Sequence, residues 1–369
     1  MKLMKTYKYK LKLTKKQEKT CESWINTCRY IYNVALEERI LAYQMRKKSV
    51  SKFDQYNQLP LIKKQFPFVS EVYSDTLGEV LDRLDKAYQS FFRGSGFPKF
   101  AKKGLYNSFT FKRHYKINEK TIKLPKIGEV KYFNSRNIIG VPKTATIIKE
   151  DNNWFICIAA EYETSFETIE IDNQNPIGLD MGATRFLALS NNTFIDAPLF
   201  LEDSLKFLRI LQRKLSRQKK GSNSREKTKN KIKTLYKKIS NQRLDFLHKI
   251  STDLSEEYSS LYMEDLKLQK MQQSHFTKTN RNMSDRGFGK LKLLLSYKFK
   301  ERGKHLGLVN PAYTSQTCNS CLSVDKKSRL TQAEFVCTNC GIIENADLNA
   351  SKNILREGIS QNTKRKTKV

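Results

Sequence analysis

Four of the seven cysteines form two Cys-x-x-Cys pairs, and no other pattern in the sequence restricts the local fold so strongly. The pairs are Cys318 with Cys321 and Cys337 with Cys340, and fifteen residues separate them. A Cys-x-x-Cys turn directs both thiolates at one metal ion, and two such turns complete a tetrahedral site. Two disulfides or four unrelated thiols are the alternatives. The spacing and a reducing cytosol favour zinc.

The segment around these cysteines is poor in apolar residues, so we expect one Zn²⁺ ion to supply its folding stability. Four thiolates leave no open position for a substrate, and the predicted zinc is therefore structural. The other three cysteines stand among apolar residues and are predicted to pack in the core. They are Cys21, Cys28 and Cys157.

The chain of 369 residues carries 69 Lys and Arg against 37 Asp and Glu, a formal net charge of +32. With 38% hydrophobic residues it is not a disordered polybasic tail. Its length suffices for about two or three domains with buried cores. A positive surplus of this size in a folded chain predicts a polyanionic partner. Charge alone does not distinguish DNA, RNA and an anionic membrane surface.

The sequence contains no apolar run long enough to insert into a membrane. The longest comparable run, residues 154–160, is much shorter than the about 18 residues that a spanning helix needs. The N-terminal residues contain no apolar signal core, which predicts a cytoplasmic protein.

Hydrophobic periodicity divides the first half of the chain. Residues 7–13 alternate between apolar residues and lysine, which predicts a half-buried strand. A capping box from Thr14 to Gln17 precedes an amphipathic helix that runs to about Lys47. After a second predicted helix at about 74–92, the period changes to two from 108 to 163, which indicates the short strands of a small β-barrel. The first strand could complete this barrel, and residues 164–175 are a predicted linker.

The densest positive charge lies in residues 206–250. This segment holds 16 Lys and Arg against Glu226 and Asp245, and its leucines and isoleucines recur with helical spacing. Residues 221–224, Gly-Ser-Asn-Ser, divide it into two predicted helices. A run of charge is often only a solvated face. Because so few acids neutralise this one, we predict that it contacts nucleic acid.

Three acids lie in or beside apolar segments. Asp180 ends the segment that begins at Ile177, Glu264 ends a second apolar strand, and Asp347 begins a helix seven residues beyond the last cysteine. A carboxylate in an apolar strand is costly to bury unless it is paired or ligates a metal. Three such acids suit two Mg²⁺ ions about 4 Å apart in a phosphoryl-transfer site. Three unconnected acids are the alternative, and spacing alone leaves both open.

Five motifs occur together in a fixed order. They are Gly178-Leu-Asp180-Met-Gly182, Glu264-Asp-Leu266, Tyr313-Thr-Ser-Gln-Thr-Cys318, Cys337-Thr-Asn-Cys340-Gly341 and Asn345-Ala-Asp347-Leu-Asn349-Ala350. Further matching segments lie at 96–100, 124–128, 243–249 and 284–289. This ordered set resembles TnpB, the transposon-encoded RNA-guided DNA endonucleases related to type V CRISPR effectors, and the resemblance covers nearly the whole chain.

The resemblance implies a multidomain α+β protein with an RNase H-like RuvC nuclease domain. Asp180, Glu264 and Asp347 would be its catalytic residues and would bind two Mg²⁺ ions, with the zinc ribbon inserted between the second and third acids. Departures from the family pattern, such as Arg286 in place of a small residue, do not touch the three acids. The implied location is the nucleoid in the cytoplasm of a bacterium or archaeon.

The resemblance also implies a division into domains. They would be a wedge β-barrel built from residues 1–14 and 105–172, a helical recognition lobe at 15–104, a RuvC-like domain at 173–315 and 342–358, a target-binding zinc ribbon at 316–341 and a basic disordered tail at 359–369.

The expected function is that of an RNA-guided DNA endonuclease that cleaves double-stranded DNA beside a short target-adjacent motif. Its expected partners are a guide RNA from the transposon end and the target DNA, with no membrane, and we expect a monomer with one RNA. A transposase that joins DNA strands without RNA is one alternative. A binding-only, RNA-guided repressor is another, although loss of an acid would favour it and all three acids are present.

Overall fold

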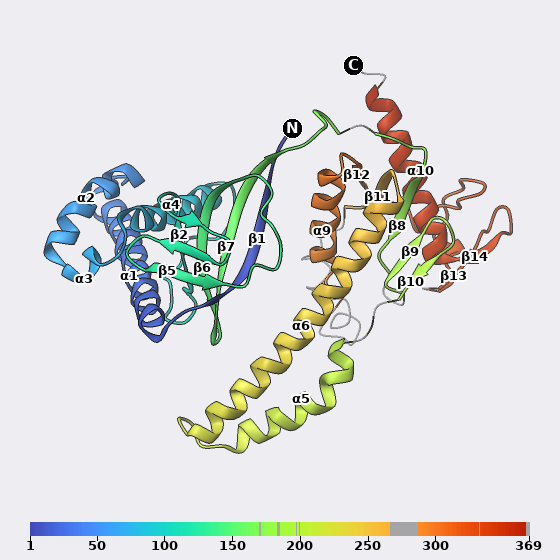
Figure 1. Cartoon of the computed structure of the whole chain (residues 1–369). Helices are drawn as coiled ribbons and strands as arrows, with labels where there is room; N and C mark the ends of the chain where they lie inside the picture. Colours follow the sequence, from blue (N-terminus) through green and yellow to red (C-terminus); the bar gives the residue numbers. More distant parts are fainter. Residues whose placement is uncertain are drawn as a thin grey trace. The chain divides into compact units, whose positions relative to one another are not determined.

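The structure, a computed structural model, describes residues 1–169, 171–182, 185–196, 198, 200–265, 286–331 and 333–366. These residues form two compact units, Met1–Ser165 and Phe166–Val369 (Figure 1). The division falls inside segment 164–175, the predicted linker. Leu266, Ser284 and Asp285 of the family-like motifs and residues 367–369 of the predicted tail lie outside the described residues.

The first unit contains a seven-stranded antiparallel sheet in the order β2-β6-β7-β1-β5-β4-β3. Its strands are β1 (Lys2–Lys12), β2 (Ser108–Phe111), β3 (Lys116–Ile117), β4 (Thr121–Leu124), β5 (Gly128–Tyr132), β6 (Val141–Glu150) and β7 (Asn153–Glu163). The N-terminal strand joins the sheet as expected, between β7 and β5. The described pairing is that of an open sheet that ends at β2 and β3, so the wedge barrel stays a prediction.

The helices of the first unit are α1 (Lys15–Arg46), α2 (Lys52–Gln65), α3 (Pro67–Ser70) and α4 (Ser74–Phe92). The capping box of α1 forms as predicted, with Thr14 Oγ1 accepting from the Gln17 amide. Trp24 of α1 packs on the rings of Phe109 and Phe111 of β2, with ring centroids 5.4 and 5.9 Å away. Sequence patterns do not predict α2, because Pro60 interrupts it and it buries few side chains.

The second unit contains a five-stranded sheet in the order β10-β9-β8-β11-β12. Its strands are β8 (Pro176–Asp180), β9 (Leu187–Leu189), β10 (Phe194–Ile195), β11 (Ser260–Glu264) and β12 (His305–Val309). The first three form an antiparallel meander, whereas β8, β11 and β12 run parallel. The carboxyl ends of β8 and β11 therefore lie at the same edge of the sheet.

Helices α6 (Asn223–Glu257) and α9 (Phe288–Glu301) cover one face of this sheet and α10 (Ala346–Lys366) the other, while α5 (Phe200–Arg217) packs on α6 (Figure 1). Leu179 and Met263 pack into one apolar cluster with side chains of α6 and α9. Tyr262, on the opposite face of β11, packs against Ile354 of α10. The basic segment forms α5 and α6, and the chain turns between them at residues 218–222, next to the predicted break.

Helix α10 continues to Lys366 and so includes residues 359–366 of the predicted tail. Ile359 extends the apolar stripe of Ile354 and packs at Tyr262. Gly358 permits this contact, since a Cβ there would lie 2.3 Å from Cδ1 of Tyr262. Within the described residues, no helix is long and apolar enough to cross a membrane.

Candidate metal centres

Asp180 and Glu264 lie side by side at the carboxyl ends of β8 and β11. The parallel register pairs Gly178 with Tyr262, two residues before each acid. Because side chains alternate along a strand, both acids share the face of Gly178 and Tyr262, which is the face covered by α10. The sheet alone therefore brings together two acids that are far apart in the sequence.

Asp347 approaches them from the first turn of α10. The helix packs so closely on β8 that a Cβ at Gly178 would lie 2.2 Å from the carbonyl oxygen of Ser351. At the end of the strand, a Cβ at Gly182 would lie 2.9 Å from Oδ2 of Asp347. The backbone after β8 thus contacts the carboxylate of Asp347, and glycine provides the space.

Burial raises the pKa of all three carboxylates. The pKa of Asp180 rises to about 8, by burial first and then by the negative charges of Glu264 and Asp347. A cation among these groups would relieve the repulsion and favour their ionised forms. Clustered carboxylate oxygens are ligands that Mg²⁺ accepts, so the donor set fits a divalent metal.

Two arginines lie beside this cluster. Arg329, from the segment between the two cysteine pairs, lies 3.6 Å from Asp347 (Nη2 to Oδ1), and its charge lowers the pKa of each of the three acids against the effect of burial. Arg286 precedes α9 and donates from Nη1 to the carbonyl oxygens of Gly182 and Arg185, the second at 2.7 Å. Arg286 thereby connects Gly182, which follows β8, with Arg185, which precedes β9.

Glu264 has a hydrogen-bond partner of its own. The hydroxyl of Thr314 donates to Oε1 of Glu264. Thr314 is buried and lies in the segment that leads from β12 to the first cysteine pair. It belongs to the Tyr313–Cys318 motif, which sequence analysis identified without assigning a role to this threonine.

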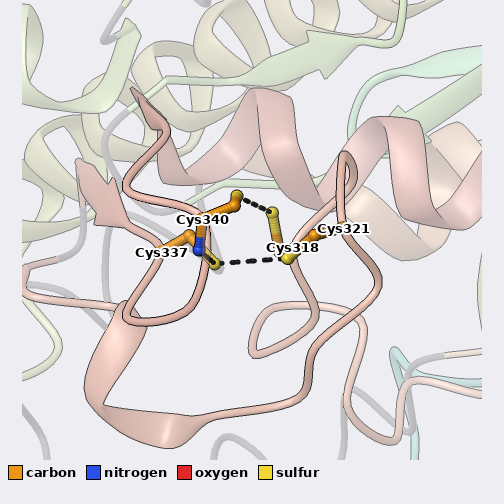
Figure 2. Close-up of side chains that lie close together, drawn as sticks. All are labelled: Cys318, Cys321, Cys337 and Cys340. Carbon is orange, nitrogen blue, oxygen red and sulfur yellow. Dashed lines mark hydrogen bonds between the residues drawn. The ribbon is translucent and has the colours of Figure 1, made fainter.

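The four cysteines converge on one point (Figure 2). Their sulfur atoms all lie within 4.8 Å of one another, with 3.7 Å between Cys318 and Cys340 and 3.5 Å between Cys321 and Cys337. A tetrahedral zinc site with Zn–S bonds of about 2.3 Å requires sulfur–sulfur distances of about 3.8 Å. The cluster therefore fits zinc, whereas disulfides would bring sulfurs to about 2.05 Å.

Hydrogen bonds to Ser323 lower the pKa of the Cys321 thiol, whereas hydrogen bonds with the other thiols raise the pKa of Cys340 against the effect of its bond to the Ile342 backbone. Among the described residues, the four cysteines are the one group of at least three His, Cys, Asp or Glu side chains with ligand atoms this close. The three carboxylates are spread more widely than the four thiols.

The cysteine-bearing segment is anchored to the helix of the third acid. It contains a 3₁₀ turn (Lys326–Ser328) and the hairpin β13 (Glu334–Val336) and β14 (Ile343–Asn345). Asn349 of α10 donates to the carbonyl oxygen of Thr317 at 2.8 Å and accepts from the Asn319 amide at 2.9 Å. Asn349 is fully buried. The position of the ribbon and that of Asp347 are therefore coupled.

The structure places the predicted acids at one edge of one sheet and the predicted zinc ligands in one cluster. Their catalytic and ligand roles stay predictions. Sequence reasoning missed Thr314 and Arg329 as neighbours of the acids, because both come from loops without hydrophobic periodicity. Thr314 lies within a recognised motif, and this position could have identified it as a site residue. No feature of the sequence singled out Arg329.

Three family models match the chain. One described as a probable transposase (OrfB of IS605) matches residues 160–275, and one described as the TNB domain of Cas12f1-like proteins matches residues 288–354. A model described as a helix-turn-helix domain matches residues 1–48, which in this structure contain strand β1 followed by the single helix α1.

Two relatives match over almost their whole length. A putative RNA-guided DNA endonuclease InsQ of Escherichia coli (strain K12) is 32% identical over 376 residues, covering 97% of this chain and 93% of the relative. A putative RNA-guided DNA endonuclease of Streptomyces pristinaespiralis is 28% identical, covering 96% and 90%.

Among solved structures, Cas12f1 in a complex with sgRNA and target DNA superposes with a TM-score of 0.61. It is 13% identical, and the match covers 96% of this chain and 98% of that one, a likeness that concerns the fold.

Proposed function

The chain belongs to the TnpB family, and on that premise we propose that it is an RNA-guided DNA endonuclease. Its partners are a guide RNA from the transposon end and double-stranded target DNA. Pairing between guide and target reads the sequence, while the protein binds backbone shape and a short target-adjacent motif. The active species is a monomer with one RNA.

The convergence of Asp180, Glu264 and Asp347 at the edge of the five-stranded sheet carries the proposal. The antiparallel meander followed by two parallel strands, with the third acid on a helix across the face, supports an RNase H-like RuvC domain. Three separate chain segments supply the acids, and the glycines at 178 and 182 leave room for them to meet.

The three carboxylates would hold two Mg²⁺ ions, which supply an activated water and stabilise the leaving 3′ oxygen. The wider spread of the carboxylates suits two ions better than one. Arg329 keeps positive charge beside the acids, and Arg286 holds the backbone at Gly182 and Arg185. The helices α5 and α6, inserted between Asp180 and Glu264, neutralise phosphates of the nucleic acid that enters the site.

Programmed cleavage tests the proposal. The protein is purified with its RNA, the bound RNA is sequenced, and a DNA duplex that matches the guide is offered with Mg²⁺. We expect Asp180→Asn, Glu264→Gln and Asp347→Asn to lose cleavage by at least about a hundredfold while still binding the target. Asp245→Asn is the matched control, because Asp245 is an exposed acid of α6 in the same unit. Full activity in Asp180→Asn would refute the assignment.

One specific observation favours a second function, namely the family model described as a probable transposase. A strand-transfer transposase would join a 3′ end to target DNA without RNA. Treating the complex with RNase before DNA is added separates the two functions, since it abolishes guided cleavage and leaves RNA-independent strand transfer intact. Target binding without cleavage by the wild type would instead identify a guided repressor.

A further inference from the structure

The backbone after β12 brings Thr314 to the end of β11. Val309 at the end of β12 is the parallel partner of Glu264, and its carbonyl oxygen accepts from the Asp265 amide at 2.8 Å. The chain then turns at Asn310, whose Oδ1 accepts from the Ala312 amide at 3.1 Å. This turn reverses the chain, so Thr314 lies beside the acid that ends the neighbouring strand.

Thr314 is held in this place from two sides. Its carbonyl oxygen accepts from Nδ2 of Asn353 at 3.0 Å, and Asn353 is buried within α10. The preceding Tyr313 has a φ of 68°, a left-handed conformation that tightens the turn, and its carbonyl oxygen accepts from the Gln316 amide at 2.9 Å. Thr314 is 6% exposed as a whole residue, so its hydroxyl lies largely away from water.

The hydroxyl of Thr314 has one proton and two acceptors within reach. It donates to Oε1 of Glu264, and the carbonyl oxygen of Pro311 lies 3.1 Å from it. The carboxylate is the stronger acceptor, because a hydrogen bond to a charged group is the stronger one. Because this hydrogen bond is made to Oε1, the second carboxylate oxygen, Oε2, is the one that would face a cation.

We propose that Thr314 is a positioning residue of the metal site: its hydroxyl fixes the Glu264 carboxylate in the orientation that binds Mg²⁺. The inference rests on the proposed function, because it assigns a role within the same site. Through Asn353 the same residue connects the second acid to α10, which carries the third acid. Thr314 therefore sets the position of Glu264 relative to Asp347.

The physical reason is the freedom of a glutamate side chain. Without a partner the carboxylate samples several rotamers, and binding a metal then requires one of them to be selected. Partners that orient a metal ligand typically change metal affinity by about 10- to 100-fold when they are removed. The hydroxyl also donates a hydrogen bond to one oxygen of the partly buried Glu264 carboxylate, and the other oxygen would bind the ion.

Three variants of the full-length protein with its bound RNA separate this role from a structural one. Thr314→Val keeps the size and shape of the side chain and removes the hydroxyl, whereas Thr314→Ser restores it. Thr317→Val is the matched control, because the Thr317 hydroxyl donates within the same turn, to the carbonyl oxygen of Tyr313 at 2.8 Å. Mn²⁺ serves as the probe, and its affinity is measured by electron paramagnetic resonance.

We expect Thr314→Val to bind Mn²⁺ about tenfold or more weakly and to need correspondingly more Mg²⁺ for half-maximal cleavage. Thr314→Ser and Thr317→Val should bind Mn²⁺ as the wild type does, and saturating Mg²⁺ should restore cleavage by Thr314→Val. Wild-type affinity in Thr314→Val overturns the inference. So does a loss of cleavage that saturating Mg²⁺ does not restore, because that result indicates a structural role.

Failure of the proposed function gives a different result. If the Asp180→Asn variant binds Mn²⁺ as tightly as the wild-type protein does, the three acids are not a metal site. The proposed role of Thr314 is then refuted together with the proposed function. If Asp180→Asn abolishes Mn²⁺ binding and Thr314→Val does not weaken it, the metal site stands and only the inference about Thr314 is refuted.

Discussion

At the scale of single residues, Gly178 determines how closely α10 approaches β8. A Cβ there would lie 2.2 Å from the carbonyl oxygen of Ser351 and 2.8 Å from Cβ of Leu355, and backbone cannot move aside as the end of a flexible side chain can. Any larger residue therefore displaces the helix that carries Asp347.

We predict that Gly178→Ala destabilises the protein by about 1–3 kcal/mol, as overpacking of a well-packed core does. It should also reduce cleavage strongly, because Asp347 moves away from Asp180. Thermal unfolding and guided cleavage measure the two effects. Gly96→Ala is the control, since a Cβ at Gly96 meets nothing within 4 Å. Equal stability of the two variants would contradict the packing argument.

The sequence was sufficient to identify the three acids but not the residues that lie beside them and orient them. Asp180 and Glu264 end apolar strands, which is a pattern visible in the sequence. Thr314 lies in a turn, Arg329 in an isolated β-bridge with Phe335 and Arg286 just before α9, so each is brought to this site only by the tertiary fold. Hydrophobic periodicity carries no information about such residues, so a structure was needed to find them.

At the scale of elements, the ribbon and α10 form one assembly. Asn353 donates to the carbonyl oxygens of Thr314 and Thr317, and Asn349 bonds the first cysteine turn. The segment between the cysteine pairs also supplies Arg329 to Asp347. Loss of zinc should therefore disturb the three acids as well as the ribbon.

We predict about one zinc per chain, whose removal by a chelator exposes four reactive thiols and weakens Mn²⁺ binding at the acids. Cys21 and Cys28 are the internal control. Burial raises the pKa of each to about 12, so at pH 8 both stay protonated and unreactive until the first unit unfolds. Mass spectrometry after alkylation counts the labelled cysteines. Fewer than about half a zinc per folded chain, or early labelling of Cys28, would count against this prediction.

The elements themselves were predictable where a pattern was regular. The capping box and an apolar stripe predicted α1, and a separate apolar stripe with the same helical spacing predicted α4. Helix α2 was not predictable from the sequence, because it contains Pro60 and buries too few side chains to show an apolar stripe. The basic composition at the end of α10 predicts a disordered tail, whereas in the structure Ile359 of this segment packs at Tyr262.

At the scale of the whole molecule, the net charge of +32 attracts any polyanion at long range. The sequence indicated a polyanionic partner from this surplus, yet only the ordered motifs indicated which one. Net charge is a sum over the chain and contains no information about geometry. The acids and cysteines stand at defined spacings, and these spacings can identify a kind of site.

We predict that replacing three exposed lysines of α6, Lys227, Lys231 and Lys238, with glutamine weakens binding of the guide RNA or target. The slope of log affinity against log salt should fall by up to about 3, close to one unit per lost phosphate contact. Lysine-to-arginine changes at the same positions keep the charge and serve as the control. Binding measured from low to high salt tests this, and an unchanged slope would exclude α6 from the nucleic-acid interface.

The position of α10 in the chain also affects how the protein is made. The helix with Asp347 follows both strand acids, the basic helices and the whole first unit in the order of synthesis. A ribosome therefore completes the elements proposed to hold RNA and DNA before it completes the proposed cutting site. On the proposed function, the chain made before α10 could bind nucleic acid, and it could cleave DNA only after α10 had folded onto the sheet.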